Sequence, residues 1–449
     1  MSYKELDKLI LGEVWSSSEA LRNLENLCDT FGPRFAGTRS EAAARKFLLQ
    51  KLSEAGVSDV HEEPVEFLAW ERRRSPKLRV LSPLKASIMS LALPYSPAGE
   101  VEAEVIDLGM GLPDDFEREH ARIRGKIVLV SNQSPPWLRR WVHRAERYGR
   151  SVRAGAVGFV FANFLPGALP ETGCVRFGRK GEIPGVSISR EDHQYLLRLL
   201  RKPPLRLQLQ TFDRTRRAVS ANVVGQIRGT ERPDEYILVG AHFDGHDISP
   251  GSDDNGSGTV ALIETARILS MHREALKRSV MFALFTAEEI GLIGARSFVG
   301  RHRALLERIR LVINVDGIGN ERGKGFDFHG WHEGKQLVAA LAKDMEWELD
   351  FACRIGMYSD HFPFILEGVP AASFGNFSKP ASGRGFGHTV ADTLDKVSLF
   401  DLREAVSTLA RSIVRFANMA PWPLRHRSPA EVKEMLRKEQ LLDIMKAEK

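Results

Sequence analysis

Short apolar runs alternate with helical segments in the second half of this chain, and this alternation is the feature that most restricts its fold. Strands that alternate with helices of about ten residues form a mainly parallel sheet with helices on both faces. The pattern therefore predicts an α/β fold with a mixed, mainly parallel sheet flanked by helices. We expect the first two strands to pair antiparallel, because only a short turn-rich link joins them. The expected strands are 222–228, 236–239, 280–285 and 311–315, and the expected helices are 258–269, 292–299 and 402–419.

Side chains that bind metal ions follow directly after three of these strands. In open α/β sheets ligands bind outside the carboxyl ends of the strands, so these side chains are expected to meet there. Zinc accepts imidazole and carboxylate ligands, and a set without cysteine is atypical of a structural zinc site, so the pattern predicts a hydrolytic metal site. The candidates are His242, Asp244, Asp253 and Asp254 after the second strand, Glu288 and Glu289 after the third, Asp316 after the fourth, and His388 in a glycine-rich loop.

The order and spacing of these residues, over about 150 positions, resemble the M28 metallopeptidases, which are co-catalytic dizinc aminopeptidases and their relatives. The resemblance implies a zinc-exopeptidase-like sheet and two zinc ions per chain, with cobalt or manganese as substitutes. The segments that carry it are His242-x-Asp244, Asp253-Asp254-Asn255-Gly256-Ser257-Gly258, Ala287-Glu288-Glu289-x-Gly291-Leu292-x-Gly294, Asn314-x-Asp316, Ser359-Asp360-His361 and His388-Thr389-x-x-Asp392-Thr393.

Five residues would hold the two metal ions if the resemblance applies. Asp254 would bridge both ions. His242 and Asp316 would complete one zinc site. Glu289 and His388 would complete the other. The two ions would lie about 3.5–4 Å apart, and the shared carboxylate offsets their repulsion while a bridging water loses its proton near neutral pH.

Three further residues receive catalytic roles from the same comparison. Glu288 would be the general base that takes the proton from the metal-bridging water and passes it to the leaving amine, because it and its neighbour cannot both point at one metal ion. Asp244 is two residues from His242 on an extended segment, so its side chain can accept the imidazole N–H. Some relatives place an oxyanion-stabilising tyrosine directly before the last histidine ligand, but Gly387 stands there, and Tyr358 is the nearest substitute.

The roles of several neighbouring residues stay open. Asp253 is interpreted as a structural neighbour of Asp254, because the family pattern places the bridging carboxylate directly before the asparagine. Asp360 either orients its loop or touches the substrate, and His361 is a weaker site candidate. His246 is expected to be a solvated loop residue, although it lies in the same loop as the first ligands.

The pattern of strands and helices changes between residues 93 and 212. Short strands at 103–108, 126–131, 156–162 and 183–188 are combined there with helices at 144–155 and 191–201. This succession resembles the protease-associated domain that is often inserted in M28 peptidases, where it acts as a lid or a substrate-selecting wall. We therefore expect a first part of the peptidase domain at 1–92, a protease-associated-like inserted α/β domain at 93–212, the metal-binding part at 213–420, and a helical tail at 421–449.

Composition describes a globular chain. Its 449 residues are 43% hydrophobic, which is enough for two or three domains. No apolar run approaches the length of a membrane span and the start lacks the apolar core of a secretory signal, so we expect a cytoplasmic protein. The cysteines, Cys28, Cys174 and Cys353, are scattered and odd in number, which argues against a disulfide framework.

A net charge of +6 and clustered arginines raise the question of nucleic-acid binding. No nucleic-acid motif accompanies the clusters, and 58 acidic residues nearly balance the 64 basic ones. We therefore expect a solvated basic surface, a peptide substrate, and neither nucleic acid nor membrane as a partner. The charged stretch 431–449 is a candidate contact for a homo-oligomer.

These inferences favour a metal-dependent exopeptidase, and among exopeptidases an aminopeptidase that hydrolyses N-terminal residues of peptides. A dipeptidase or carboxypeptidase of the same family is the first alternative. A glutaminyl-cyclase-like enzyme with a single zinc and a non-catalytic binding protein are the others. The complete set of ligands and the base argue against these last two.

Overall fold

The computed structural model describes residues 1–135, 137–138, 140–202, 204–320, 322–377 and 385–448. The chain divides into two compact units. The first unit comprises Met1–Glu66, Val219–Gly387 and Asp392–Glu439, and the second comprises Phe67–Ala218, His388–Ala391 and Gln440–Lys449. The expected insertion began at residue 93 and ended at 212, whereas the second unit begins and ends inside the two long strands β1 and β10.

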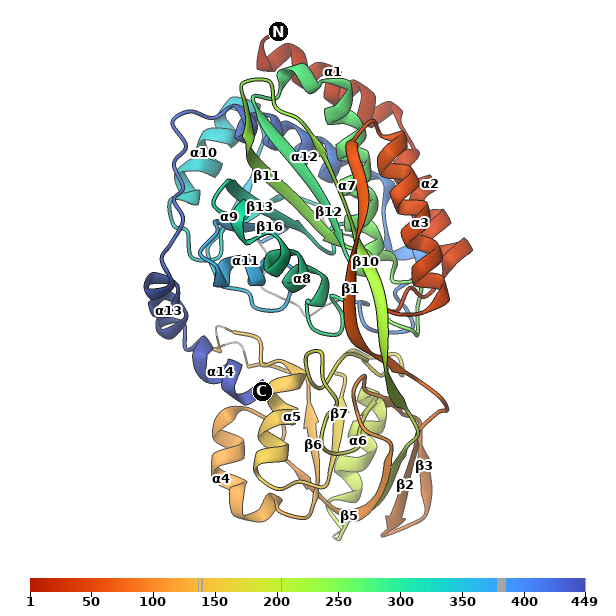
Figure 1. Cartoon of the computed structure of the whole chain (residues 1–449). Helices are drawn as coiled ribbons and strands as arrows, with labels where there is room; N and C mark the ends of the chain where they lie inside the picture. The colour runs from red at the N-terminus through yellow and green to blue at the C-terminus, as the bar shows by residue number, and fades with distance from the viewer. Residues whose placement is uncertain (136, 139, 203, 321, 378–384, 449) are drawn as a thin grey trace. The chain divides into compact units, whose positions relative to one another are not determined.

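The first unit is built on a mixed sheet with the strand order β1-β10-β12-β11-β13-β16-β14-β15 (Figure 1). Its centre is parallel, because β11 pairs in parallel with β12 and β13, and β13 pairs in parallel with β16. The strands are β1 (Ser58–Glu71), β10 (Arg214–Ile227), β11 (Arg232–His242), β12 (Arg278–Phe285), β13 (Ile309–Val315), β14 (Gly325–Asp327), β15 (Asp350–Ala352) and β16 (Ala371–Gly375).

The expected antiparallel pairing of the first two strands of this region is wrong. Strand β12 lies between them, antiparallel to β10 with Val223 opposite Leu284, and parallel to β11 with Val239 opposite Phe282. Every residue of β12 is buried. A fully buried strand is most stable in the interior of the sheet, where a neighbouring strand on each side accepts and donates its backbone hydrogen bonds.

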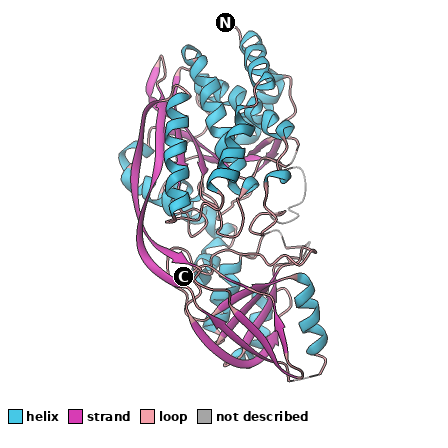
Figure 2. Ribbon diagram, turned by 90° about the vertical axis from the view of Figure 1, so that its right-hand side faces the viewer, coloured by secondary structure: helices cyan, strands magenta, loops and turns pink. Residues whose placement is uncertain are grey.

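Helices cover both faces of this sheet (Figures 1 and 2). Helix α7 packs against α12, α2 and α3, and α8 packs against α11. No helix among the described residues is long and apolar enough to cross a membrane. The helices are α1 (Tyr3–Ser16), α2 (Glu19–Glu25), α3 (Arg39–Glu54), α7 (Gly258–Met271), α8 (Ile293–Arg301), α9 (Arg303–Leu306), α10 (Gly334–Met345), α11 (Phe362–Leu366), α12 (Leu399–Asn418) and α13 (Pro429–Lys438), with short helical turns at Asn26–Phe31, Ser252–Ser257, Arg273–Ala275 and Leu394–Lys396.

Helix α1 illustrates how local sequence sets these elements. Its buried side chains Leu6, Ile10 and Val14 recur every four residues, which places them on one face. Ser2 begins the helix by accepting the backbone N–H of Glu5, whose carboxylate in turn accepts the backbone N–H of Ser2.

The second unit is a smaller α/β domain with its own sheet, in the order β3-β2-β9-β5-β6-β7-β8-β4. Strands β5 to β8 are parallel, and side chains such as Leu129, Val160 and Leu196 form its buried core. Its elements are β2 (Lys77–Ser82), β3 (Ala86–Ile88), β4 (Leu91–Ala92), β5 (Gly99–Asp107), α4 (Pro113–Ile123), β6 (Ile127–Ser131), α5 (Arg144–Arg153), β7 (Gly158–Ala162), β8 (Gly185–Ile188), α6 (Arg190–Leu199), β9 (Arg206–Thr211) and α14 (Leu441–Glu448). The α/β fold class with an inserted α/β domain is confirmed.

Candidate metal centre

The candidate ligands meet at the carboxyl edge of the parallel part of the first sheet. Strands β12, β11 and β13 are neighbours in that order and run in the same direction, so the residues that follow them gather at one edge. His242 is the last residue of β11, and Asp316 directly follows β13. Glu288 and Glu289 follow β12, which lies on the other side of β11 from β13.

His242 is the centre of the cluster. Its side chain is buried, and its Nε2 atom lies 3.4 Å from Oδ1 of Asp254 and 3.4 Å from Oδ1 of Asp316. Ligand-type atoms of His242, Asp254 and Glu289 all lie within 4.8 Å of one another, as do those of His242, Glu288 and Asp316. Among the predicted residues of the first unit, the structure therefore brings together one imidazole and four carboxylates.

The loop that carries Asp254 is held by a second pair of acidic residues. Asp392 accepts the backbone N–H groups of Asp253 at 2.8 Å and of Asp254 at 3.2 Å. The carboxylate of Asp253 accepts the backbone N–H of Gly319 at 3.0 Å. Burial raises the pKa of Asp253 to about 7, and the hydrogen bond from Gly319 opposes that rise. Asp253 thus ties the loop to the segment after β13.

Arg34, to which sequence analysis gave no role, supports the same loop from the N-terminal region. Its guanidinium is fully buried and donates to the backbone oxygens of Phe243 at 2.9 Å, Pro250 at 2.5 Å and Gly251 at 3.0 Å. A buried arginine saturated with carbonyl acceptors fixes the path of the backbone between His242 and Asp254. Its position in the turn after Gly32 and Pro33 gave no hint of these partners.

Asp244 links the first ligand loop to the glutamates. Its carboxylate accepts the backbone N–H of Glu288 at 3.1 Å and of Glu289 at 3.4 Å. The Nδ1 atom of His242 lies 3.1 Å from the backbone oxygen of Asp244 and 3.7 Å from its carboxylate. The imidazole of His242 therefore lies close to both the backbone oxygen and the carboxylate of Asp244, and the orienting role of this carboxylate stays a prediction.

The turn between β12 and α8 presents Glu288 and Glu289 in a constrained backbone. Ala287 has a φ of 56°, in the left-handed region that residues with a side chain rarely adopt. Gly294 is needed at the start of α8, because a Cβ atom there would lie 2.4 Å from the backbone oxygen of Thr286. These features explain the small residues of the motif around the two glutamates.

Negative charge is concentrated in this buried space. Burial raises the pKa of Glu288 well above its usual range, and the charges of Glu289 and Asp360 add to this effect while His242 opposes it. Burial lowers the pKa of His242, but the charges of Glu288 and Asp316 outweigh it and hold that pKa well above its ordinary value. Both carboxylate oxygens of Asp360 are buried without a hydrogen-bond partner among the described residues. Crowded, desolvated carboxylates beside an imidazole are the donor set that fits divalent cations.

The motif Ser359-Asp360-His361 contributes two different contacts, and Tyr358 directly precedes it. The hydroxyl of Ser359 donates to Oδ2 of Asp316 at 2.7 Å, so it orients a candidate ligand. His361 stacks on His329 with ring centroids 3.8 Å apart, which is a packing role. Tyr358, the candidate oxyanion donor, is partly buried directly before Ser359.

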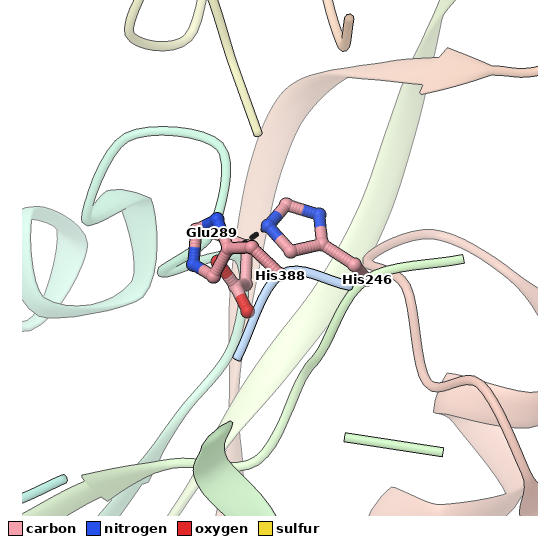
Figure 3. A group of neighbouring side chains, drawn as sticks. All are labelled: His246, Glu289 and His388. Atoms are coloured by element: carbon pink, nitrogen blue, oxygen red, sulfur yellow. Dashed lines mark ion pairs between the residues drawn. The ribbon is translucent and has the colours of Figure 1, made fainter. Parts of the chain in front are cut away.

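His246 is a residue that sequence reasoning missed, and the expectation that it is solvated is wrong. Its side chain is buried against the ring of Phe35, and its Nε2 atom lies 2.9 Å from Oε2 of Glu289 (Figure 3). The signal was its place four residues after His242 in the ligand loop. His388 belongs to the second unit, where its Nδ1 atom lies 3.2 Å from the backbone oxygen of Thr172, and its metal-binding role stays a prediction.

Comparison with known proteins agrees with this fold. Residues 222–413 match the profile of peptidase family M28, and residues 101–196 match that of the PA domain. Carboxypeptidase Q of Mus musculus is 26% identical over 388 residues, which are 83% of this chain and 81% of that protein.

Solved structures share the fold. The crystal structure of a peptidase M28 precursor from Shewanella amazonensis SB2B superposes with a TM-score of 0.80 at 24% identity, over 95% of this chain and all of that chain (100%). The zinc aminopeptidase BSAP from Bacillus subtilis superposes with a TM-score of 0.67 at 23% identity, over 88% of this chain and 93% of that chain. With its family profile matched over the ligand-bearing strands and the PA profile over the second unit, this chain belongs to peptidase family M28, a family of metallo-exopeptidases, and carries a PA domain.

Proposed function

We propose that this chain is an aminopeptidase that hydrolyses the N-terminal residue of short peptides with two bound metal ions. The observation that carries the proposal is the buried cluster in which His242, Asp254 and Glu289 each offer one ligand atom within 4.8 Å of the others. A carboxylate close to both an imidazole and a second carboxylate suits a bridge between two ions.

The proposed ions are two zinc ions, for which cobalt or manganese can substitute. Asp254 is the bridge. His242 and Asp316 complete the first site, and Glu289 and His388 complete the second. When bound, the ions supply Lewis-acid polarisation of the scissile carbonyl and lower the pKa of the attacking water.

Glu288 is the proposed proton carrier. Burial raises its pKa, and two bound dications would favour its ionised form, so that it can accept the proton of the attacking water and donate it to the amine that leaves. The hydrogen bond from its backbone N–H to Asp244 holds it at the edge of the sheet beside His242. Tyr358 is the proposed donor to the oxyanion that develops on the scissile carbonyl, because it directly precedes the Ser359 that orients Asp316.

The charge of the site supports recognition of a peptide N-terminus. A free α-ammonium group is cationic, and a site with an excess of buried negative charge attracts it and disfavours an anion in the same place. Six carboxylates, more than the four positive charges of two divalent ions, surround His242 or contact its neighbours: Asp244, Asp254, Glu288, Glu289, Asp316 and Asp360. The similarity to carboxypeptidase Q favours a carboxypeptidase or dipeptidase as the second candidate.

The test is hydrolysis by the zinc-loaded full-length protein of matched substrates: aminoacyl chromogenic amides, unblocked tripeptides, N-acetylated tripeptides and dipeptides. The proposal expects turnover of the unblocked substrates and none of the N-acetylated ones, with the N-terminal residue released first. Glu288→Gln should abolish turnover, whereas Glu274→Gln, at an exposed position far along the chain from any ligand, should not change it. Release of the C-terminal residue from N-acetylated tripeptides would instead assign the carboxypeptidase activity.

A further inference from the structure

The turn between β12 and α8 carries two proposed functional residues, the base Glu288 and the ligand Glu289. We propose that Glu41 of α3 is a positioning residue for this turn and that it acts through the hydroxyl group of Thr286. Glu41 lies 245 positions before Thr286 in the sequence. The inference rests on the proposed function, because it concerns how the protein presents these two glutamates to the metal ions and the attacking water.

The turn has a backbone that needs support from its surroundings. Ala287 and Leu292 have φ angles of 56° and 57°, in the left-handed region that residues with a side chain rarely adopt. Such conformations persist only where the surrounding structure determines them. Thr286 is the first residue after β12 and directly precedes Ala287, so contacts that fix Thr286 also limit how far the turn can relax.

Asn222 of β10 fixes the backbone at both ends of the turn. Its Oδ1 atom accepts the N–H of Thr286 at 3.2 Å, and its Nδ2 atom donates to the backbone oxygen of Gly294 at 3.0 Å. The N–H of Gly294 in turn donates to the backbone oxygen of Thr286 at 2.9 Å. The two ends of the turn are therefore joined to each other and to β10.

Glu41 holds the side chain of Thr286. The Thr286 hydroxyl donates to Oε1 of Glu41 at 3.1 Å, and the hydroxyl of Ser220 in β10 donates to the same oxygen. All three residues are buried, and the exposed fraction of Glu41 is only 1%. Asn222 and Glu41 thus fix the backbone and the side chain of one residue, so Thr286 cannot move without breaking a buried hydrogen bond.

The carboxylate of Glu41 lies in the interior, although its position in the helix favours another contact. Glu41 is the third residue of α3, where a carboxylate usually accepts a backbone N–H at the start of the helix. Burial raises the pKa of Glu41, and the hydrogen bond from Ser220 opposes that rise. Nη1 of Arg45 lies 3.7 Å from Oε1 and supplies an opposite charge. A buried carboxylate is costly unless it is hydrogen-bonded and paired, so these contacts keep its oxygen in one place beside Thr286.

Loss of the contact from Glu41 should disturb the two glutamates of the turn. Their backbone N–H groups donate to Asp244 at 3.1 and 3.4 Å, and these hydrogen bonds depend on the path of the turn. Without the carboxylate, the side chain of Thr286 would no longer restrain the left-handed Ala287 beside it. A displacement of ~1 Å in a catalytic group can lower the rate about 100-fold, so a small relaxation of the turn is sufficient for a measurable effect.

The test compares variants that remove one hydrogen-bonding group with variants that keep it. Thr286→Val removes the hydroxyl and keeps the shape of the side chain, whereas Thr286→Ser keeps the hydroxyl. Glu41→Met removes the carboxylate, whereas Glu41→Gln keeps an acceptor oxygen. The matched control is Thr265→Val in α7, because Thr265 is a buried threonine whose hydroxyl has no hydrogen-bond partner among the described residues.

Hydrogen exchange of the metal-free protein measures the turn without metal or substrate. Thr286→Val and Glu41→Met should raise the exchange rates of the backbone amides of 287–293 about tenfold or more and leave those of α12 unchanged. The same two variants should bind zinc about tenfold or more weakly in calorimetry, because the turn carries a proposed ligand. At saturating zinc their kcat should fall about tenfold or more while KM stays within about threefold. Thr286→Ser, Glu41→Gln and Thr265→Val should stay within about threefold of wild type in each measurement.

The double variant of Glu41→Met and Thr286→Val tests whether Glu41 acts through Thr286. It should lose no more than Glu41→Met alone, because both substitutions break the same hydrogen bond. The proposal is overturned if the two losses multiply, if residues 287–293 exchange at the wild-type rate in both single variants, or if exchange rises equally in α12. Should Glu41→Met not fold, equal exchange in Thr286→Val and Thr286→Ser would refute the proposal, and faster exchange in Thr286→Val alone would support it. Absence of turnover in wild type would contradict the proposed function and not this inference, because exchange is measured without catalysis.

Discussion

The carboxylate of Asp244 accepts the backbone N–H of Glu288 at 3.1 Å, which joins the loop after β11 to the turn after β12. The two residues are 44 positions apart in the sequence, and their strands are parallel neighbours. One side chain from the histidine-bearing loop thus fixes the backbone that presents the proposed base.

Removal of this carboxylate should impair catalysis more than folding. We expect Asp244→Ala to lower kcat or zinc affinity by about 10- to 100-fold, because positioning groups behind metal ligands typically have effects of this size. Asp244→Asn, which keeps one oxygen acceptor, should lose less. The measurement is steady-state kinetics at saturating zinc together with a zinc titration. Asp234→Ala, at a position with a 79% exposed side chain, is the control, and unchanged kcat and zinc affinity in Asp244→Ala would refute the linkage.

Single substitutions of Glu288 and Glu289 should have different effects, because the two residues have different proposed roles. Glu288→Gln should keep both metal ions and lose about 10²- to 10⁴-fold in kcat, because it removes the proton acceptor. Glu289→Ala should weaken one metal site, with zinc lost under mild chelation. Metal analysis after dialysis, combined with kcat, distinguishes the two. The reverse pattern would mean that the roles of base and ligand are exchanged.

His246 should matter for the metal site although sequence reasoning placed it in solvent. Its Nε2 atom lies 2.9 Å from the carboxylate of Glu289, so it either binds the same ion or orients that ligand. We expect His246→Ala to weaken zinc binding by about tenfold or more. His120→Ala, on the exposed surface of α4, provides the comparison. Equal zinc affinities of His246→Ala and His120→Ala would show that His246 contributes only to packing and not to metal binding.

The buried pair His329 and His361 should make the first unit sensitive to acid. Burial lowers the pKa of His329 to about 4, against the opposing hydrogen bond to the backbone oxygen of Arg354, whereas an unfolded chain has a histidine pKa of ~6.5. Between these values the unfolded state binds more protons than the folded state, so stability is lost as the pH falls from about 6.5 to 4. The difference corresponds to about 3 kcal/mol in the free energy of unfolding.

Urea unfolding of the metal-free protein at pH 7 and pH 4 measures this effect, and chelation removes the contribution of metal loss. His329→Gln has no imidazole to titrate at this position. The decrease in its free energy of unfolding from pH 7 to pH 4 should therefore be about 3 kcal/mol smaller than the decrease measured for wild type. Parallel losses in wild type and His329→Gln would show that the buried imidazole does not contribute to the acid sensitivity.

The sequence was sufficient to predict the strands that carry the site, because long apolar runs such as 280–285 have few alternatives to a buried strand. Their order was not predictable in the same way. A short link between β10 and β11 suggested a hairpin, yet β12 pairs with both, and such a choice depends on the burial of a segment about 40 residues later in the sequence. The short strands β14, β15 and β16 were missed, because three to five residues carry too little periodicity to be recognised.

The candidate ligands were predictable because each one follows a strand in a pattern that the family shares. The residues around them were not. The roles of Arg34 and His246 depend on tertiary contacts. Arg34 donates to backbone oxygens more than 200 residues away in the sequence. His246 contacts the carboxylate of Glu289.

We propose that this chain hydrolyses the N-terminal peptide bond and that His242, Asp254, Glu289, Asp316 and His388 would hold the two metal ions that the reaction needs. The most direct test is to titrate the metal-free protein with zinc and to follow hydrolysis of an aminoacyl chromogenic amide at each step. We predict that activity rises until two equivalents of zinc per chain have been added and then stays constant. Full activity at one equivalent, or no hydrolysis at any ratio of zinc, cobalt or manganese, would contradict it.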